Sequence, residues 1–143
     1  MATLEENKAI VRRYLDEFWN GNASVADEVI AQDYSAHDPG TPGRQGGVAG
    51  EKQTMAMYFE VFPDFRLQIE DMVAEGDRVA ARWTVRGTQR GALPGLPPTG
   101  KTATISGISV YRLRDGQIAE HWLNWDTLGM LQQLGAIPAS GSA

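Results

Sequence analysis

The sequence predicts an α+β fold, in which helices from the first half of the chain cover one side of an antiparallel sheet formed by the second half. Up to Pro63 the apolar residues recur at spacings of three and four, which is the helical period. After Pro63 they alternate with polar residues, as in half-buried antiparallel strands. No alternation of strands and helices of the parallel type is visible, so we expect the helices to gather on one side of the sheet.

Three helices are expected before Pro63. The first lies in ENKAIVRRYLDEFWNG and ends at Gly21, with Phe18 on its apolar face. The second lies in SVADEVIAQ, where Ser24 and Asp27 resemble a capping box. The third begins near Val48 and carries four aromatic or sulfur-bearing side chains on one face: Met55, Tyr58, Phe59 and Phe62.

A loop is expected between about Ser35 and Gly50, because HDPGTPGRQGG is too rich in glycine and proline for regular structure. This loop carries His37. A lone histidine before Asp-Pro is most often a turn residue, and a place beside a binding pocket is the alternative.

At least four strands are expected after Pro63. Two lie in the alternating segments 65–70 and 78–86, and the second segment leaves open whether Arg82 or Trp83 faces inward. The other two, ATISGISVYRL and QIAEHWLNWD, flank the two-residue turn Asp115-Gly116. The segment TLGMLQQLG then predicts a closing helix that ends at Gly135.

The turn at Asp115-Gly116 sets the register of the last two strands. Counting back from it without a bulge predicts that Gly107, Ser109, Trp122, Asn124 and Asp126 share one face of the sheet. The opposite face would carry Ile108, Val110, His121, Leu123 and Trp125. On this count His121 and Asp126 form no catalytic dyad unless a bulge intervenes.

Asp126 has two interpretations. A carboxylate at the rim of an apolar hollow, beside the small residues Gly107 and Ser109, suits a general acid or base because desolvation raises its pKa. Asp126 also stands directly before a helix, where aspartate is a preferred N-cap and where its pKa would be lowered. Trp122 and Asn124 would line the same hollow as substrate-binding residues.

Composition limits the partners and cofactors. The 143 residues suit a single domain, expected at 1–137, followed by a flexible tail at 138–143. With a net charge of −5 and no cluster of basic residues, nucleic acid is not an expected partner. No cysteine and only two histidines are present, so we expect no metal site and no disulfide. Without a signal peptide or membrane-spanning run, we expect a cytoplasmic protein.

Six segments together resemble the SnoaL-like polyketide cyclases, also called ester cyclases, of the nuclear transport factor 2-like superfamily. They are IVRRYLDEFWNG, DYSAHDPGTPG, FPDFRLQIEDMVAEGDRVAARWTVRGT, GLPPTGK, YRLRDGQIAEHW and DTLGMLQQLG. The resemblance implies a cone-shaped barrel, in which a curved antiparallel sheet wraps about three N-terminal helices around a deep pocket. It also implies a homodimer packed through the outer sheet face, and chemistry without a cofactor.

In these cyclases the carboxylate that matches Asp126 is the general acid/base of an intramolecular aldol ring closure. The family's facing Gln and His are replaced here by Gly107 and Ser109, and Asn124 and His37 could substitute for them as polar partners. Phe18 matches a pocket-lining aromatic of the family, although core packing is the alternative. Phe59 on the third helix completes the set of candidate substrate-binding residues.

We therefore expect a cofactor-independent, polyketide-cyclase-like enzyme that acts on a small, apolar, carbonyl-bearing substrate by cyclisation, isomerisation or hydrolysis. The alternatives are a non-catalytic small-molecule binding protein of the same fold and a cofactor-free oxygenase.

Overall fold

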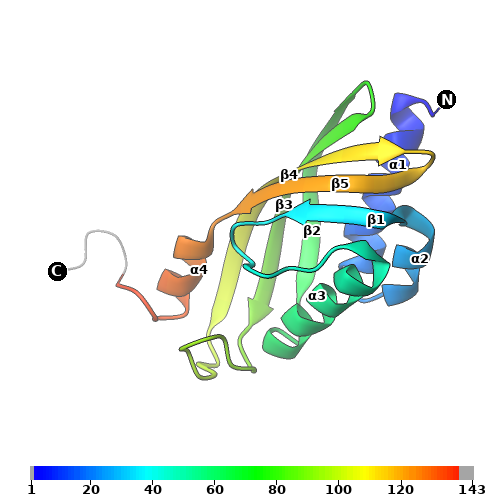
Figure 1. Cartoon of the computed structure of the whole chain (residues 1–143). Helices are drawn as coiled ribbons and strands as arrows, with labels where there is room; N and C mark the ends of the chain where they lie inside the picture. The colour runs from blue at the N-terminus through cyan, green and yellow to red at the C-terminus, as the bar shows by residue number, and fades with distance from the viewer. Residues whose placement is uncertain (1, 139–143) are drawn as a thin grey trace.

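The computed structural model describes residues 2–138, in which helices pack against one face of a curved five-stranded sheet (Figure 1). The N-terminal helix α1 (Leu4–Arg13) continues into a π-helical segment, Tyr14–Phe18. A 3-10 turn, Ala23–Val25, and the short helix α2 (Ala26–Val29) follow. Helix α3 spans Gly47–Val61, and α4 (Thr127–Gln133) comes after the last strand.

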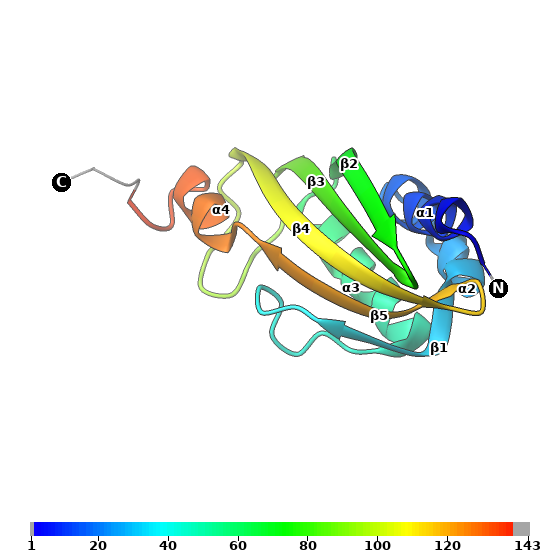
Figure 2. The ribbon, with the colours of Figure 1, turned by 90° about the horizontal axis from the view of Figure 1, so that it is seen from above.

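The sheet has the order β1-β5-β4-β3-β2, which Figure 2 shows from above. Strands β2 (Arg66–Glu75), β3 (Arg78–Thr88), β4 (Thr102–Arg114) and β5 (Gln117–Trp125) form an antiparallel meander. Strand β1 (Ile30–His37) pairs in parallel with β5. The predicted α+β class and the curved sheet are confirmed, but the sheet is open, with β1 and β2 at its two edges, and does not close into a barrel.

Strand β1 is the element that the sequence pattern does not predict. Residues 30–32 were expected at the end of the second helix and 35–37 in a loop, with no element expected at 33–34, whereas α2 stops at Val29 and β1 extends from Ile30 to His37. The expected Ser24–Asp27 capping box is also absent, because the Ser24 hydroxyl donates to the side chain of Asn22. Hydrogen bonds to β5 satisfy the backbone groups of β1. The local sequence of residues 30–37 does not indicate that β5 is the partner strand.

The hairpin between β4 and β5 turns as predicted. Asp115 and Gly116 both have positive φ, +52° and +77°, as a type I′ turn requires, and Arg114 faces Gln117. Beyond Leu113 and Ile118 the register shifts, because Arg112 pairs with Glu120 and leaves Ala119 as an extra residue. This β-bulge reverses the facing of every later residue of β5 relative to the unbulged count.

The concave face of the sheet holds the core, and the bulge decides which side chains of β5 join it. His121 and Leu123 are buried there, and Trp125 lines the same face. In β3, Trp83 points inward, whereas Arg82 lies outside and pairs with Asp71 at 3.2 Å.

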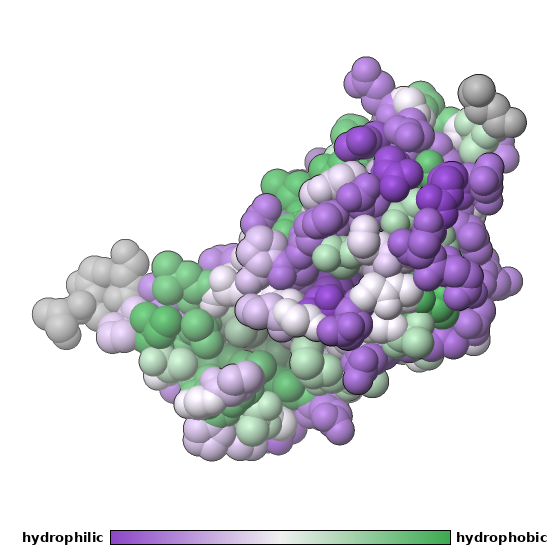
Figure 3. All heavy atoms as spheres, viewed as in Figure 1, coloured by the Kyte–Doolittle hydropathy of each residue, from purple (hydrophilic) through white to green (hydrophobic). Residues whose placement is uncertain are grey.

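The two ends of the molecule differ in polarity. Figure 3 shows hydrophobic residues gathered around α4 and the adjoining loop, and hydrophilic residues around the opposite end. Leu128 and Ile137 are among the exposed large apolar side chains at the α4 end. Within residues 2–138, no helix has the length and apolar character needed to cross a membrane.

The domain expected at 1–137 stays a prediction, and the structure describes residues 2–138. Of the tail expected at 138–143, residues 139–143 lie outside them.

Candidate functional site

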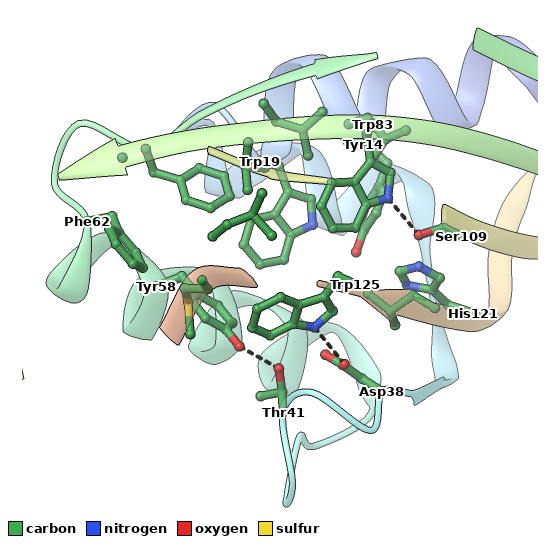
Figure 4. A pocket seen from close by; sticks show the side chains of 18 of the residues that line it. Tyr14, Trp19, Asp38, Thr41, Tyr58, Phe62, Trp83, Ser109, His121 and Trp125 are labelled. Atoms are coloured by element: carbon green, nitrogen blue, oxygen red, sulfur yellow. Dashed lines mark hydrogen bonds between the residues drawn. The ribbon is translucent and has the colours of Figure 1, made fainter. Parts of the chain in front are cut away.

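A cavity lies between the concave face of the sheet, the N-terminal helix and α3. It holds about 670 Å³ of empty space, counting its open mouth. Eight aromatic side chains line it, several of which are labelled in Figure 4: Tyr14, Trp19, Tyr58, Phe62, Phe65, Trp83, Tyr111 and Trp125. Such a wall favours a planar, mainly apolar ligand.

The π-helical segment positions one side of the cavity. The Trp19 amide bonds to the carbonyl of Tyr14, five residues back, at 3.2 Å. Tyr14, Leu15 and Trp19 all line the cavity as a result. Single π turns of this kind recur at functional sites, because the extra residue redirects side chains without ending the helix.

Polar atoms gather at one end of the cavity, which we call the inner end and define by Ser109, Tyr111 and His121. The three side chains are 0–2% exposed, and Tyr111 pairs directly with His121 across β4 and β5. The Trp83 indole donates to the Ser109 hydroxyl at 2.9 Å (Figure 4). The Tyr111 hydroxyl and His121 Nε2 have no partner among residues 2–138.

His121 is held in place by tyrosines. Its Nδ1 lies 3.1 Å from the Tyr34 hydroxyl, and its ring stacks on that of Tyr111 with centroids 4.3 Å apart. Tyr14 packs edge-on against the same imidazole. Burial, with smaller contributions from the positive charges of Arg44 and His37, lowers the pKa of His121 well below its ordinary value. The imidazole is therefore neutral at neutral pH.

A buried charge cluster lies beside the inner end. Arg44, from the glycine-rich loop, donates to Asp38 at 3.0 Å and to both oxygens of Glu51 at 2.7 and 2.8 Å. The Tyr14 hydroxyl also donates to Glu51. All three charged side chains are at most 4% exposed, so two carboxylates and one guanidinium leave a local charge of −1.

The same loop closes another part of the wall. The Trp125 indole donates to Asp38 at 3.1 Å, and Thr41 and Tyr58 share a hydrogen bond of 2.5 Å (Figure 4). Gly40 lies so close to Trp125 that an added Cβ would stand 2.4 Å from its indole nitrogen. Asp38 accepts from Gly40 as well, so both of its oxygens are engaged in hydrogen bonds.

Of the residues expected to bind substrate, Ser109 lines the cavity. Gly107 faces the same side, but Trp83 fills the space above it, and an added Cβ would stand 2.4 Å from the Trp83 ring. Phe18 is fully buried in the core, stacked on Tyr14, and Phe59 packs against Phe65. None of Gly107, Phe18 and Phe59 is part of the cavity wall.

The predicted orientation of the β5 side chains is wrong beyond Ala119. This places two further candidate residues on the other face of the sheet. Trp122 pairs with Val110 and the exposed Asn124 with Ile108, both on the convex face of the sheet. His121, Leu123 and Trp125, expected on the outer face, line the cavity instead. The physical reason is the bulge, which inserts one residue into a structure of period two.

Asp126 is the N-cap of α4. Its carboxylate accepts the Gly129 amide at 2.8 Å, the residue is exposed, and it does not line the cavity. His37 ends β1 at the surface, where Nε2 lies 2.8 Å from the Glu120 carboxylate and the ring stacks on Trp122. The structure therefore does not bring Asp126, His37 and Ser109 together at one site.

Sequence reasoning missed the cavity roles of His121, Arg44 and Asp38. The signal for His121 was its place among apolar residues near a hairpin, which an unbulged count assigned to the wrong face. Arg44 and Asp38 lie in a loop whose composition indicates only irregular structure. Within residues 2–138, no three His, Asp or Glu side chains come together in a way that could hold a metal ion.

Comparison with solved structures shows what the fold is similar to. TsrD from Streptomyces laurentii superimposes with a TM-score of 0.85 at 27% identity, covering 96% of this chain and 100% of TsrD. A candidate polyketide cyclase from Acidithiobacillus ferrooxidans gives 0.82 at 36% identity, covering 94% and 97%. IdmH, a candidate polyketide cyclase from Streptomyces antibioticus, gives 0.80 at 33% identity, covering 90% and 98%.

No curated protein sequence matches the chain. The family model of the SnoaL-like polyketide cyclases matches residues 9–134, which include all the helices and strands from the end of α1 onward. Together with relatives above 30% identity over nearly the whole chain, this match shows that the protein belongs to the SnoaL-like polyketide cyclase family.

Proposed function

We propose that the protein is a polyketide-cyclase-like enzyme that binds a planar, mainly apolar, carbonyl-bearing molecule in the cavity. In this proposal His121 donates a hydrogen bond to the carbonyl oxygen, and the proton on the neighbouring carbon is lost to solvent water. The observation that carries this proposal is the buried, neutral His121, whose Nε2 has no partner among residues 2–138 and stands in the wall of an aromatic cavity. Family membership supports a reaction of the cyclase type. Enolisation is its first requirement, because ring closure of the aldol type needs a carbon nucleophile.

The proposal assigns the contact with the reacting group to His121 in place of Asp126. His121 is a titratable side chain of the wall with a nitrogen left unpaired. Asp38 also lines the cavity, but both of its oxygens already accept hydrogen bonds. The exposure of Asp126 and its bond to Gly129 favour a helix cap over the acid/base role that the family resemblance implies.

Hydrogen–deuterium exchange tests this function without knowledge of the natural substrate. The protein is incubated in D₂O with aryl ketones whose uncatalysed exchange is slow, such as 1-indanone and 1-tetralone, and loss of the proton next to the carbonyl is followed by ¹H NMR. We expect catalysed exchange with the wild type and strong loss of it with His121→Gln. The matched control is His37→Gln, the same substitution in the chain's other histidine, which lies at the surface.

The same assay decides between His121 as the hydrogen-bond donor to the carbonyl and Asp126 as an acid/base. If Asp126→Asn abolishes exchange and His121→Gln does not, the role belongs to Asp126 and our assignment is wrong. The expected result is the reverse, because asparagine is as good an N-cap as aspartate and preserves α4.

A non-catalytic binding protein is the second candidate. It is favoured by the replacement of the family's polar pair by Gly107 and Ser109 and by the exposed position of Asp126. Tight binding of an aryl ketone without any catalysed exchange across the panel would support this alternative.

A further inference from the structure

We propose that the inner end of the cavity is a subsite for one uncharged carbonyl oxygen, which accepts hydrogen bonds from the Tyr111 hydroxyl and from His121 Nε2. The inference deepens the proposed function, since it states how the carbonyl-bearing ligand is oriented and which ligands are rejected. It rests on the hydrogen-bond inventory of three side chains and on the charges beside them.

The unpaired atoms at the inner end are the first observation. Tyr111 and His121 are 0% and 2% exposed, and each presents a polar atom without a partner among residues 2–138. Buried polar atoms are nearly always hydrogen-bonded, so two orphans at adjoining positions of a cavity wall indicate a polar group of a ligand. Because Tyr111 and His121 form a directly opposed pair with stacked rings, their free atoms are presented by neighbouring side chains.

Both atoms are donors. A tyrosine hydroxyl always has a proton to donate, and the Tyr111 hydroxyl stays protonated because burial raises its pKa. For His121 the relevant contact is with Tyr34, whose buried hydroxyl lies 3.1 Å from His121 Nδ1. We assign the donor role in this contact to the Tyr34 hydroxyl, which places the imidazole proton on Nε2. Tyr34 is thus a positioning residue for His121.

Ser109 adds to the donor character of the inner end. Its oxygen accepts the Trp83 indole proton at 2.9 Å, and its own hydroxyl proton can bond to the neighbouring Tyr111 hydroxyl, which leaves the Tyr111 proton for a ligand. Such a subsite suits an oxygen that only accepts, which is a ketone or quinone carbonyl. An alcohol fits less well, because only the hydroxyl oxygens of Tyr111 and Ser109 could accept its proton.

The neighbouring charges decide between a carbonyl and an anion. Asp38, Glu51 and Arg44 carry a combined charge of −1 in a buried environment, where charges interact strongly. The Arg44 guanidinium is already paired with both carboxylates, and His37 is engaged with Glu120. A carboxylate or phenolate at the inner end would therefore find no unpaired cation beside it, whereas an uncharged carbonyl needs none.

The test uses binding and vibrational spectroscopy, neither of which requires turnover. The probe is 2-acetonaphthone with a ¹³C-labelled carbonyl, a planar aryl ketone. Its affinity is measured by equilibrium dialysis against three analogues of similar shape: 2-isopropenylnaphthalene, 1-(2-naphthyl)ethanol and 2-naphthoate. We expect the ketone to bind on the order of tenfold more tightly than the hydrocarbon and the alcohol, with 2-naphthoate the weakest ligand.

Infrared difference spectra then report on the hydrogen bonds themselves. We expect the carbonyl stretch of the bound ketone at a lower frequency in the wild type than in Tyr111→Phe or His121→Gln, and a loss of affinity of about fivefold in Tyr111→Phe. Tyr58→Phe is the matched control, because Tyr58 also lines the cavity but its hydroxyl is bonded to Thr41. It should leave the carbonyl frequency unchanged. Structural damage alone would not shift the carbonyl band in Tyr111→Phe and His121→Gln while leaving it unchanged in Tyr58→Phe.

Nitrogen NMR checks the tautomer, and only two histidines have to be assigned. We expect ¹⁵N shifts of a neutral His121 protonated on Nε2, and a mixture of tautomers in Tyr34→Phe.

The inference is overturned if the wild type protonates Nδ1 instead, if the carbonyl band is the same in wild type and Tyr111→Phe, or if no aryl ketone binds better than its hydrocarbon analogue. A shifted band without any catalysed deuterium exchange would leave the subsite standing and contradict the proposed function instead.

Discussion

His121 is a titratable residue that lies almost wholly inside the protein. It is 2% exposed, bonded to one tyrosine and enclosed by two more. Its pKa is lowered well below the ordinary value, chiefly by burial. The His121 imidazole binds a proton less readily in the folded protein than in the unfolded chain. This single residue therefore links stability to pH.

We predict that the free energy of unfolding falls as the pH drops below about 6.5, the ordinary histidine pKa, with His121 contributing up to about 1.4 kcal/mol for each pH unit. The sign follows from proton binding, since below that pH the unfolded state holds one proton more than the folded state. Urea unfolding of the wild type and His121→Gln at pH 7.5, 6.0 and 5.0 measures it. Equal pH dependence in both proteins would contradict the lowered pKa of His121.

Asp126 offers a second test at the scale of one residue. Its carboxylate accepts the Gly129 amide at the start of α4. We predict that Asp126→Ala lowers the free energy of unfolding by about 1 kcal/mol, whereas Asp126→Asn changes it little, because asparagine caps equally well. Chemical denaturation of the three proteins distinguishes these outcomes. An equal loss in both variants would show that the negative charge, and not capping, is what the helix needs.

At the scale of elements, buried ion pairs and hydrogen bonds hold the loop between β1 and α3 in place. Its Arg44 joins Asp38 on the loop to Glu51 on α3, and Trp125 on β5 bonds to the same aspartate. Since the cavity wall includes Asp38, Thr41 and Arg44, the cluster fixes the shape of the site as well as the loop.

We predict that Glu51→Gln destabilises the fold by about 3–5 kcal/mol, because it leaves the buried Arg44 with one carboxylate where it had two. The exposed pair Lys52–Asp27 on neighbouring elements supplies the control. Asp27→Asn should cost no more than about 1 kcal/mol, because both side chains of that pair are in contact with solvent. Thermal and urea unfolding provide both values, and similar losses in the two variants would contradict a tightly coupled cluster.

At the scale of the whole molecule, all four tyrosines of the chain lie in or beside the core. Burial raises the pKa of each of them: Tyr14, Tyr34, Tyr58 and Tyr111. The folded state therefore keeps phenol protons that the unfolded chain loses near pH 10. Stability contributed by these groups is complete below pH 10 and is lost as the pH rises above it.

We predict that the folded protein shows little tyrosinate absorbance at 295 nm until the alkaline pH at which it unfolds. The rise in absorbance should then coincide with the loss of the far-ultraviolet circular dichroism signal. Protein in guanidinium chloride serves as the reference, in which the four groups titrate together near pH 10. A partial rise in absorbance before unfolding would assign an ordinary pKa to at least one tyrosine.

The convex face of the sheet stays the surface on which a homodimer is predicted. The bulge changes its composition, however, so that Trp122 and Asn124 join Ile108 there in place of Leu123 and Trp125. Sedimentation of the wild type and of Ile108→Lys tests the dimer, since a charge in a packed interface would dissociate it.

The sequence by itself determined the α+β class, the helices before Pro63, the meander and the turn at Asp115-Gly116. Each of these depends on local period or turn chemistry, which neighbouring residues carry. It also determined the family, since matching segments extend over nearly the whole chain.

Only the tertiary structure decided the strand 30–37, the bulge at Ala119 and, with it, which half of EHWLNWD faces the cavity. The strand depends on pairing between segments far apart in the chain, because β1 extends along β5. The bulge depends on the ladder of β4 and β5, whose eight residue pairs skip Ala119. Because side chains alternate with a period of two, that one extra residue exchanged Trp122 and Asn124 for His121, Leu123 and Trp125 at the site.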